Sequence, residues 1–146
     1  MTATGAPART DSVICFSTAD WDAPLWTNKQ HLMSRLGERG VAVLYLDSLG
    51  LRTPGLGRSD VRRMARRLRE WRAYAAEAAP GVYRDSPLVV PLHRSAGVRA
   101  VNRRLLAHRL SRNERRLGLR RPVVWAYTPA AAEAYRPERH RALVYH

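Results

Sequence analysis

The chain has 146 residues, of which 45% are hydrophobic and 26% are charged. This length fits one ordinary domain with a single core, and the apolar content excludes a wholly disordered chain. Basic residues outnumber acidic ones by 26 to 12, and the net charge of +14 would attract nucleic acid, anionic lipid or an acidic substrate. Only Lys29 is a lysine, however, and alanine and arginine recur throughout, as a GC-rich coding sequence produces without selection for a partner. The charge alone therefore predicts no partner.

The chain carries one cysteine and no segment typical of membrane insertion. Cys15 lies inside an apolar run, so it cannot form an intramolecular disulfide and is expected to pack as a small hydrophobic residue. No apolar stretch reaches the roughly 20 residues that span a bilayer. Residues 1–11 lack the apolar middle of a signal peptide, and we expect them to form a flexible leader before a domain over residues 12–146. These features predict a cytoplasmic protein.

A strand, a helix and a second strand are predicted in succession near the start of the chain. Residues 12–17 (SVICFS) form a continuous apolar run rich in β-branched and aromatic types, which indicates a strand buried on both faces. After a polar and aromatic loop over residues 18–26, apolar residues recur at helical spacing over residues 27–39, and Gly40 stops the helix. Residues 41–47 (VAVLYLD) predict a second buried strand. This βαβ pattern predicts an α/β fold with an open, Rossmann-like parallel sheet.

The rest of the chain predicts further alternation of helices and strands. Residues 48–59 are rich in glycine and predict a loop, after which Asp60 caps a basic amphipathic helix that runs to Ala78 and ends at Pro80-Gly81. The elements expected next are an edge strand over 87–92, a basic helix over 97–117, a strand over 122–127, a short helix over 129–135 and a strand over 142–145. Because the chain ends directly after an apolar strand, we expect it to be truncated.

Polar and aromatic side chains occur in two loops that should meet at the carboxyl edge of this sheet. Ligands of open parallel sheets bind at this edge, where the strand order reverses beside the first strand. With the usual order 3-2-1-4-5, the loops after the first and fourth strands adjoin. They offer the flat apolar surface and hydrogen-bonding groups that sugar-like ligands require, and the candidate acceptor-binding residues are Asp20, Trp21, Asp22, Trp26, Asn28, Tyr127 and Thr128. Alternatively, Trp21 and Trp26 pin the loop onto the domain while Asp20 and Asp22 cap turns.

One histidine is a candidate catalytic residue. His31 lies close to the predicted crevice, and a neutral imidazole can accept a proton from an attacking hydroxyl at physiological pH. Its place one turn into the predicted helix also suits a packing or capping role. His93 and His108 lie in basic surroundings with no paired carboxylate, which predicts surface positions.

Motifs of several other chemistries are missing from the sequence. Gly55-Leu56-Gly57 has no third glycine at the required offset and follows the second strand, so it is not a dinucleotide fingerprint. Neither a phosphate-binding P-loop nor the GxSxG elbow of acyl-transfer enzymes occurs. A lone cysteine and scattered histidines give no set of metal ligands. We therefore expect neither a metal nor a cofactor.

The basic amphipathic helix allows two interpretations. Its arginines could lie on an anionic membrane surface, where each well-placed charge contributes on the order of 1 kcal/mol. Alternatively, its apolar face covers the sheet and its arginines face water. We favour the second interpretation for the apolar face, because a parallel sheet must be covered. The arginines can still contact lipid headgroups.

Two stretches resemble a known family of enzymes. The opening VICFSTADWDAPLWTNKQHLMSRLGERGVAVLYLD resembles the start of bacterial glycosyltransferases of the two-Rossmann-domain (GT-B) type, in which a strand, a Trp-bearing loop and a QHL helix precede a second strand. PVVWAYTP and the terminal LVYH are similar to later strands of the same amino-terminal domain, and the last residues resemble the lead-in to a Tyr-Asp/His-Cys-x-Asp motif that this chain lacks. The likeness covers nearly the whole chain after the leader, although the middle third matches only in pattern.

The resemblance implies an enzyme that transfers a sugar from a nucleotide-sugar donor to a cell-envelope polysaccharide or a lipid-linked glycan. The acceptor would bind this domain, and the donor would bind mainly to a carboxyl-terminal domain that this chain lacks. No metal is usually needed in such enzymes, because positive side chains and a helix amino terminus stabilise the leaving diphosphate. The implied location is the cytoplasm, with peripheral contact at the inner face of the cell membrane. Because that domain would bind the donor, the resemblance implies that this chain alone is inactive.

Two rival interpretations stay open. The charge would also suit a non-enzymatic module that binds nucleic acid or an anionic surface. Nucleic acid is disfavoured because no recognised binding motif occurs and the aromatic residues lie in strands or one loop rather than among the arginines. The chain could also be a fragment with no function of its own.

Overall fold

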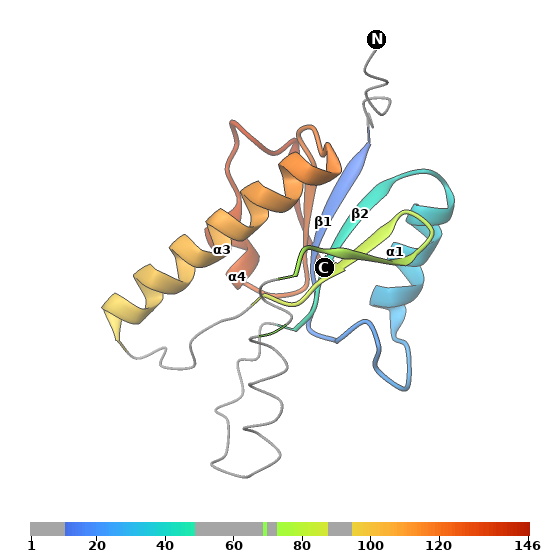
Figure 1. Ribbon diagram of the computed structural model, residues 1–146, viewed down its shortest axis with the longest axis horizontal. Coiled ribbons are helices and arrows are strands. Elements are labelled where there is room, and N and C mark those ends of the chain that lie inside the picture. Colours follow the sequence, from blue (N-terminus) through green and yellow to red (C-terminus); the bar gives the residue numbers. More distant parts are fainter. Residues whose placement is uncertain (1–10, 49–68, 70–72, 88–94) are drawn as a thin grey trace.

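The computed structural model describes residues 11–48, 69, 73–87 and 95–146, which form an α/β fold on one six-stranded sheet (Figure 1). The strand order is β3-β4-β2-β1-β5-β6. All neighbouring strands are parallel except β3, which lies at one edge and pairs antiparallel with β4. From β1 the chain steps to β2 and β4 on one side and to β5 and β6 on the other. The predicted α/β class is confirmed, and the sheet is parallel as predicted except for β3, which was not predicted. The order agrees with the expected 3-2-1-4-5, although β4 takes the place of the strand expected at 87–92.

The central strands β1 (Ser12–Phe16) and β2 (Ala42–Leu46) are buried along their whole length. Ile14 of β1 lies between Leu44 of β2 and Val124 of β5 (Val123–Ala126) in the ladder. Such strands are continuously apolar because both faces of the sheet are covered. Cys15 is buried in β1 as a free thiol, as predicted, and burial raises its pKa so that it stays protonated.

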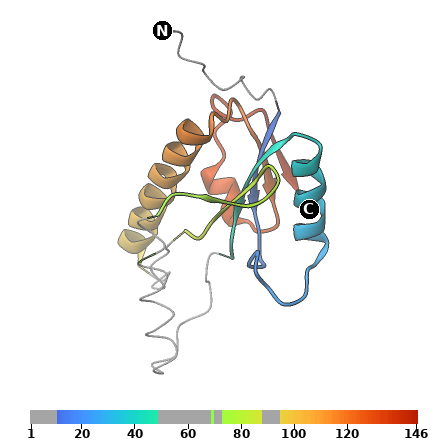
Figure 2. The same cartoon turned by 45° about the vertical axis from the view of Figure 1, so that its right-hand side comes forward.

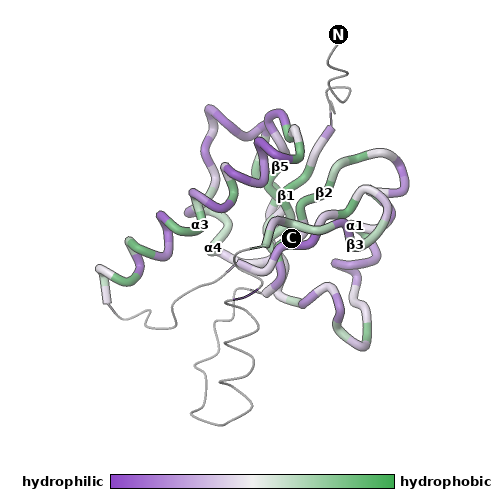
Figure 3. The backbone as a smooth tube through the Cα atoms, viewed as in Figure 1, coloured by the Kyte–Doolittle hydropathy of each residue, from purple (hydrophilic) through white to green (hydrophobic). Residues whose placement is uncertain are grey.

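Helices cover the two faces of the sheet (Figures 1 and 2). Helix α1 (Asn28–Glu38) covers one face, the α1 face, whereas α3 (Ala96–Leu117) and α4 (Ala130–Ala134) cover the other, the α3 face. The core on the α1 face consists of Val13, Cys15, Trp21, Met33, Val43, Tyr45 and Val82. The core on the α3 face includes Ile14, Phe16, Leu44, Leu46, Ala75, Leu110, Val124, Ala126 and Ala131. Figure 3 shows hydrophobic stretches in the central strands and alternating hydrophilic and hydrophobic turns along α3.

Local chemistry fixes both ends of α1. At its start, the Oε1 atom of the buried Gln30 accepts hydrogen bonds from the backbone N–H and the hydroxyl of Thr27, at 3.0 and 2.8 Å. The amide of Gln30 also donates to the carbonyl oxygen of Asp20 at 3.0 Å, so the loop after β1 is fastened to the helix. At its end, Gly40 has a φ of 87°, which glycine adopts without strain. The predicted helix and its glycine stop are confirmed.

A hairpin replaces two of the predicted elements. β3 (Ala76–Ala79) and β4 (Val82–Asp85) are joined by a turn in which Gly81 has a φ of 72°. The prediction that the helix before Pro80 runs to Ala78 is therefore wrong at its end, because these residues pair as a strand with β4. The prediction of the next strand at 87–92 is also wrong in position, because β4 pairs with β2 and Pro87 lies outside any strand.

Other expectations lie partly outside the described residues. These are the leader up to residue 10, the loop over 49–59, most of the helix expected from 61 onward, residues 88–92 of the predicted strand, and His93.

Asp11 accepts hydrogen bonds from the backbone of Ala42 and from Arg141 of the segment before β6 (Ala142–Tyr145). In the described part of the chain, no helix has the length and apolar character needed to cross a membrane.

Candidate functional site

The carboxyl ends of the parallel strands lie at one edge of the sheet, and we call the loops there the carboxyl-edge site. Two backbone hydrogen bonds extend the ladder beyond the strands: Ser17 donates to Leu46 at 3.2 Å and Asp47 donates to Asp85 at 2.9 Å. The loop after β1 and the residues after β2 and β4 are thereby held side by side. Ligands of open parallel sheets bind at this edge.

A buried carboxylate organises the site. The Oδ1 atom of Asp47 accepts a hydrogen bond from the backbone N–H of Trp21 at 2.8 Å, and Oδ2 accepts from Nε of Arg84 at 2.6 Å and from the Ser86 hydroxyl at 3.1 Å. Nη1 of Arg84 reaches Asp22 at 3.0 Å. The Asp47 side chain is 1% exposed and that of Asp22 is 56% exposed. This chain of charges ties the loop after β1 to β2 and β4 and leads from the interior to the surface.

Burial and pairing set the ionisation of these groups. Burial raises the pKa of Asp47, and this effect outweighs the hydrogen bonds from Trp21 and Arg84 that favour the carboxylate. Burial alone would lower the pKa of Arg84, but the hydrogen bond and charge of Asp47, together with Asp22, raise it overall. Arg84 is therefore a fixed cation, and protonation of Asp47 would remove its buried partner.

The two tryptophans of the loop lie in different environments. Trp21 is 6% exposed and packs edge-on against Tyr45, with ring centroids 5.0 Å apart. Trp26 is 40% exposed, donates from its indole N–H to the carbonyl oxygen of Trp21 at 3.1 Å, and lies 4.8 Å from the Trp21 ring. The exposed His31 packs against Trp26, with centroids 5.4 Å apart. Trp21 thus pins the loop, whereas Trp26 and His31 present ring surface to solvent.

The start of the loop is fixed by a compact hydrogen-bond network. The Tyr45 hydroxyl donates to the carbonyl oxygen of Ala19 at 2.8 Å and pairs with the Ser17 hydroxyl at 2.6 Å. Burial raises the pKa of Tyr45, so the phenol stays a neutral donor. The carboxylate of Asp20 accepts from the backbone N–H of Ser48 at 3.2 Å. Asp20 therefore holds the loop in place and joins it to the end of β2.

The segment after β5 contributes a second group of the predicted residues. Tyr127 is half-buried on the α1 face, where Nζ of Lys29 lies 5.1 Å from its ring centroid and the ring of His146 lies 5.2 Å away. Thr128 is buried, and its hydroxyl oxygen accepts from the first N–H of α4 at 3.4 Å. Asn28 is exposed as the first residue of α1.

The predicted site residues therefore form two groups. The first group surrounds Asp47 and comprises Asp20, Trp21, Asp22, Trp26 and His31, and the second consists of Tyr127 and Thr128 beside β5. Lys29, next to Asn28 in the first turn of α1, reaches from α1 to the second group. Helix α1 thus contacts both groups, the first through Gln30 and the second through Lys29.

Comparison of the chain with models of protein families, with curated proteins and with solved structures found no match. The function of the chain therefore has to be inferred from its own side chains. Within residues 11–48, 69, 73–87 and 95–146, no three His, Cys, Asp or Glu side chains are arranged to hold a metal ion. The carboxyl-edge site instead offers an exposed indole, an imidazole and an ion pair, which suit stacking and hydrogen bonding with a polar organic ligand.

Three residues of this site, Asp47, Arg84 and Lys29, are not predicted from the sequence. Asp47 ends a predicted buried strand, and an acid at the carboxyl end of such a strand is a usable signal. Arg84 was missed because the hairpin that places it was not predicted. Lys29 was noted only as the lone lysine, and its contact with Tyr127 across about 100 residues of chain has no local sequence signal.

Proposed function

We propose that this chain is the acceptor-binding, Rossmann-like domain of a two-domain glycosyltransferase, and that the carboxyl-edge site holds a sugar or a lipid-linked glycan. The support is the resemblance of the sequence together with the place of Trp26, Asp22 and Arg84 at the ligand-binding edge of a parallel sheet. A second domain would bring the nucleotide-sugar donor. A fragment with no function of its own would bind no ligand at this edge.

The observation that carries the proposal is the half-exposed indole of Trp26 on the same loop as Asp22, which pairs with Arg84 of β4. A sugar ring presents C–H groups that pack on an aromatic face and hydroxyls that bond to charged side chains. Trp26 is fixed by its hydrogen bond to Trp21 and by its ring contacts, so little side-chain freedom is lost on binding. A preformed stacking surface of this kind favours carbohydrate over a small inorganic ligand.

The remaining residues have distinct roles in this proposal. Trp26 stacks on the acceptor, and the exposed carboxylate of Asp22 accepts from its hydroxyls. His31, beside Trp26, is the base that takes the proton from the attacking hydroxyl. Asn28 and Tyr127 contact the acceptor from the first turn of α1 and the segment after β5. Asp20, Trp21 and Thr128 act by positioning the backbone, because each is already engaged within the domain.

The test is binding of a panel of neutral oligosaccharides to the full chain, followed through the indole N–H resonances in NMR spectra. We expect at least one glycan to shift the Trp26 resonance saturably, and Trp26→Ala to abolish this binding. Tyr145→Ala is the matched control, because it removes another exposed aromatic ring (68% exposed) that lies on the edge strand β6, in register with Ala126 of the α3 face. If no glycan shifts the Trp26 resonance, or if both variants weaken binding equally, the proposal is wrong.

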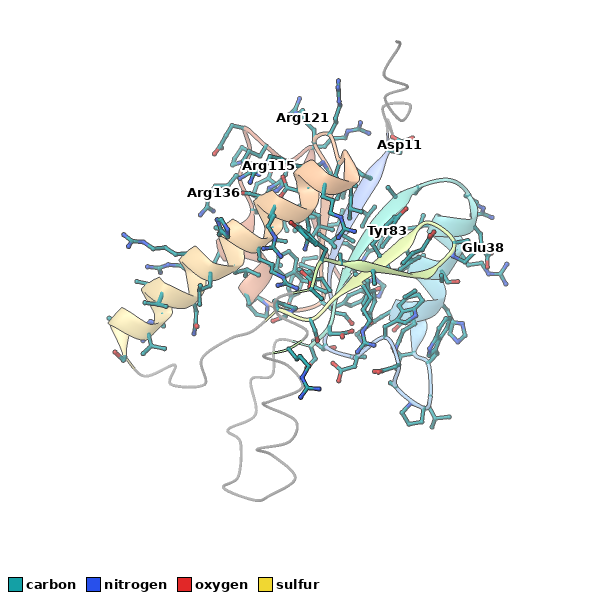
Figure 4. All side chains as sticks on the ribbon, in the orientation of Figure 1. Asp11, Glu38, Tyr83, Arg115, Arg121 and Arg136 are labelled. Carbon is teal, nitrogen blue, oxygen red and sulfur yellow. The ribbon has the colours of Figure 1, made fainter. Side chains whose placement is uncertain are left out.

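A second candidate function is docking on an anionic membrane surface. The observation that favours it is a series of exposed arginines along α3, namely Arg99, Arg103, Arg104, Arg115 and Arg116. Figure 4 shows Arg115, Arg121 and Arg136 around this helix and the segments beside it. Sedimentation with phosphatidylglycerol vesicles, lost at high salt and absent with phosphatidylcholine vesicles, would support it. Equal binding of arbitrary DNA with steep salt dependence would favour nucleic acid instead.

A further inference from the structure

Two arginines of α3 lie against one exposed aromatic ring on the α3 face, across the sheet from Trp26. The guanidinium carbons of Arg112 and Arg116 lie 4.4 and 4.2 Å from the centroid of the Tyr74 ring. Tyr74 is 50% exposed, and the neighbouring Ala75 belongs to the core beneath α3. Both guanidiniums therefore lie beside the same phenol ring.

No acid in the described part of the chain neutralises this pair of charges. Its ion pairs involve neither Arg112 nor Arg116. The buried acids that contact α3 are already occupied, since Asp85 is paired with Arg109 and Glu114 with Arg139. Among the residues that the structure describes, the cluster therefore has no acidic partner for either positive charge.

Two nitrogen donors of the cluster also lack a hydrogen-bond partner. Nε and Nη2 of Arg112 are buried and have no hydrogen-bond partner, and Nη1 of Arg116 makes one long bond, 3.4 Å, to the carbonyl oxygen of Ala75. Buried donors without an acceptor are unfavourable. A tetrahedral oxyanion would supply the missing acceptors, because guanidinium groups bind phosphate oxygens through two parallel N–H bonds.

We propose that Arg112 and Arg116, steadied by the Tyr74 ring, form a binding site for a phosphate group. Binding requires a small movement of the Arg112 guanidinium to expose its buried N–H groups. The phosphate group belongs either to a soluble phosphate or to a phosphorylated lipid. The site lies on the α3 face and does not depend on the proposed glycosyltransferase function.

A purely structural role for the cluster makes a different prediction. In that case the arginines only pin residues 73–75 to α3, and phosphate has no more effect on the wild type than on variants without the cluster. A bound phosphate, in contrast, stabilises the folded state in proportion to its occupancy of the site. The change in melting temperature with phosphate concentration therefore separates the two roles.

The experiment titrates inorganic phosphate into the full chain at constant ionic strength and follows melting temperature and NMR signals of the arginine side chains. We expect saturable binding to the wild type that is about tenfold or more weaker in Arg112→Gln/Arg116→Gln, because charge-assisted hydrogen bonds are lost. The matched control is Arg35→Gln/Arg39→Gln, which removes two exposed charges at the carboxyl end of α1, outside the cluster, and should leave binding unchanged. Arg112→Lys/Arg116→Lys keeps both charges without the planar forks and should bind with intermediate strength.

A second arm replaces inorganic phosphate with vesicles that contain phosphatidic acid, compared with phosphatidylcholine alone. If free phosphate binds and Arg112→Gln/Arg116→Gln weakens that binding, the ligand is a soluble phosphate. If only the phosphatidic acid vesicles bind in this way, the ligand is a lipid headgroup. Equal weakening in both glutamine variants would show that only overall charge matters and would overturn the proposal. Failure of both probes to bind the wild type would overturn it as well.

Discussion

The guanidinium of Arg109 forms a two-pronged ion pair with the carboxylate of Asp85, and both side chains are buried beneath α3. Nε of Arg109 lies 2.8 Å from Oδ2 of Asp85, and Nη2 contacts Oδ1 and donates to the carbonyl oxygen of Ala73 at 3.0 Å. The amide of Asn113, one turn further along α3, donates to the same carboxylate at 2.6 Å. This cluster joins α3 to the carboxyl end of β4 and to the segment before β3.

Replacement of Arg109 by Met should strongly destabilise the fold. The substitution leaves the buried Asp85 carboxylate without a cation, and breaking a buried pair in this way typically costs about 3–5 kcal/mol. The control is Arg103→Met, an exposed position on the same helix, where a change within about 0.5 kcal/mol is expected. Urea denaturation gives both values. Similar midpoints for the two variants would mean that the Arg109–Asp85 pair adds nothing to stability.

Asp47 should give the stability of the protein a recognisable dependence on pH. Its pKa is raised above the ordinary value of 3.8, so the folded chain holds this proton more tightly than the unfolded chain. At a pH between the pKa values of Asp47 in the unfolded and folded chains, Asp47 is ionised in the unfolded chain and still protonated in the folded one. Stability contributed by Asp47 is therefore present at low pH and is lost as pH rises through the folded-state pKa.

Asp47→Asn isolates this contribution, because it keeps an oxygen acceptor for Trp21 but cannot ionise. The free energy of unfolding, measured by urea denaturation from about pH 3 to pH 7, brackets the ordinary range of carboxyl pKa values. The difference, wild type minus variant, should fall as pH rises. A difference that grows with pH would show that the ion pair with Arg84 outweighs the burial of the carboxylate.

The sequence predicts the centre of this sheet better than its edge. β1 and β2 are continuous apolar runs because they are covered on both faces, and their spacing around α1 specifies a parallel unit. The β3–β4 hairpin escaped prediction because the alanine-rich stretch before Pro80 favours a helix locally, whereas pairing with β4 gives it strand structure. Pro80-Gly81 predicts the end of a helix but forms the hairpin turn between β3 and β4, and either role suits these residues.

The candidate site, like the sheet, could be predicted from the sequence only in part. Its place follows from topology alone, since loops after parallel strands gather at the carboxyl edge. The Asp47–Arg84 pair joins residues 37 positions apart and depends on the hairpin, so no local pattern indicates it. Sequence also could not distinguish Trp21 from Trp26, because which ring is buried depends on how the loop folds back over Tyr45.

Gly37 and Gly97 should respond in opposite ways to substitution by alanine. A Cβ atom at Gly37 would collide with the carbonyl oxygen of Pro80 and lie 2.8 Å from Cγ2 of Val82, because α1 passes directly over the hairpin turn. We expect a loss of about 1–3 kcal/mol from this overpacking. At Gly97 the nearest atom is the Ser95 hydroxyl oxygen at 3.7 Å, so Gly97→Ala should stabilise α3 by about 0.5–1 kcal/mol. Thermal unfolding of both variants tests this prediction. Equal shifts in melting temperature would contradict the close approach of α1 to the turn.

Substitutions of the two tryptophans of the loop should separate effects on stability from effects on ligand binding. Trp21→Ala removes a buried ring that contacts Tyr45, and we expect it to cost about 3–5 kcal/mol. Trp26→Ala removes a half-exposed ring whose contacts are the rings of Trp21 and His31, so a cost of about 1 kcal/mol is expected. Urea denaturation gives these costs, and glycan titration of the Trp26→Ala variant under native conditions then reports binding alone. If that variant binds glycans as the wild type does, Trp26 is only a cover for Trp21, and the stacking role belongs to no residue of this loop.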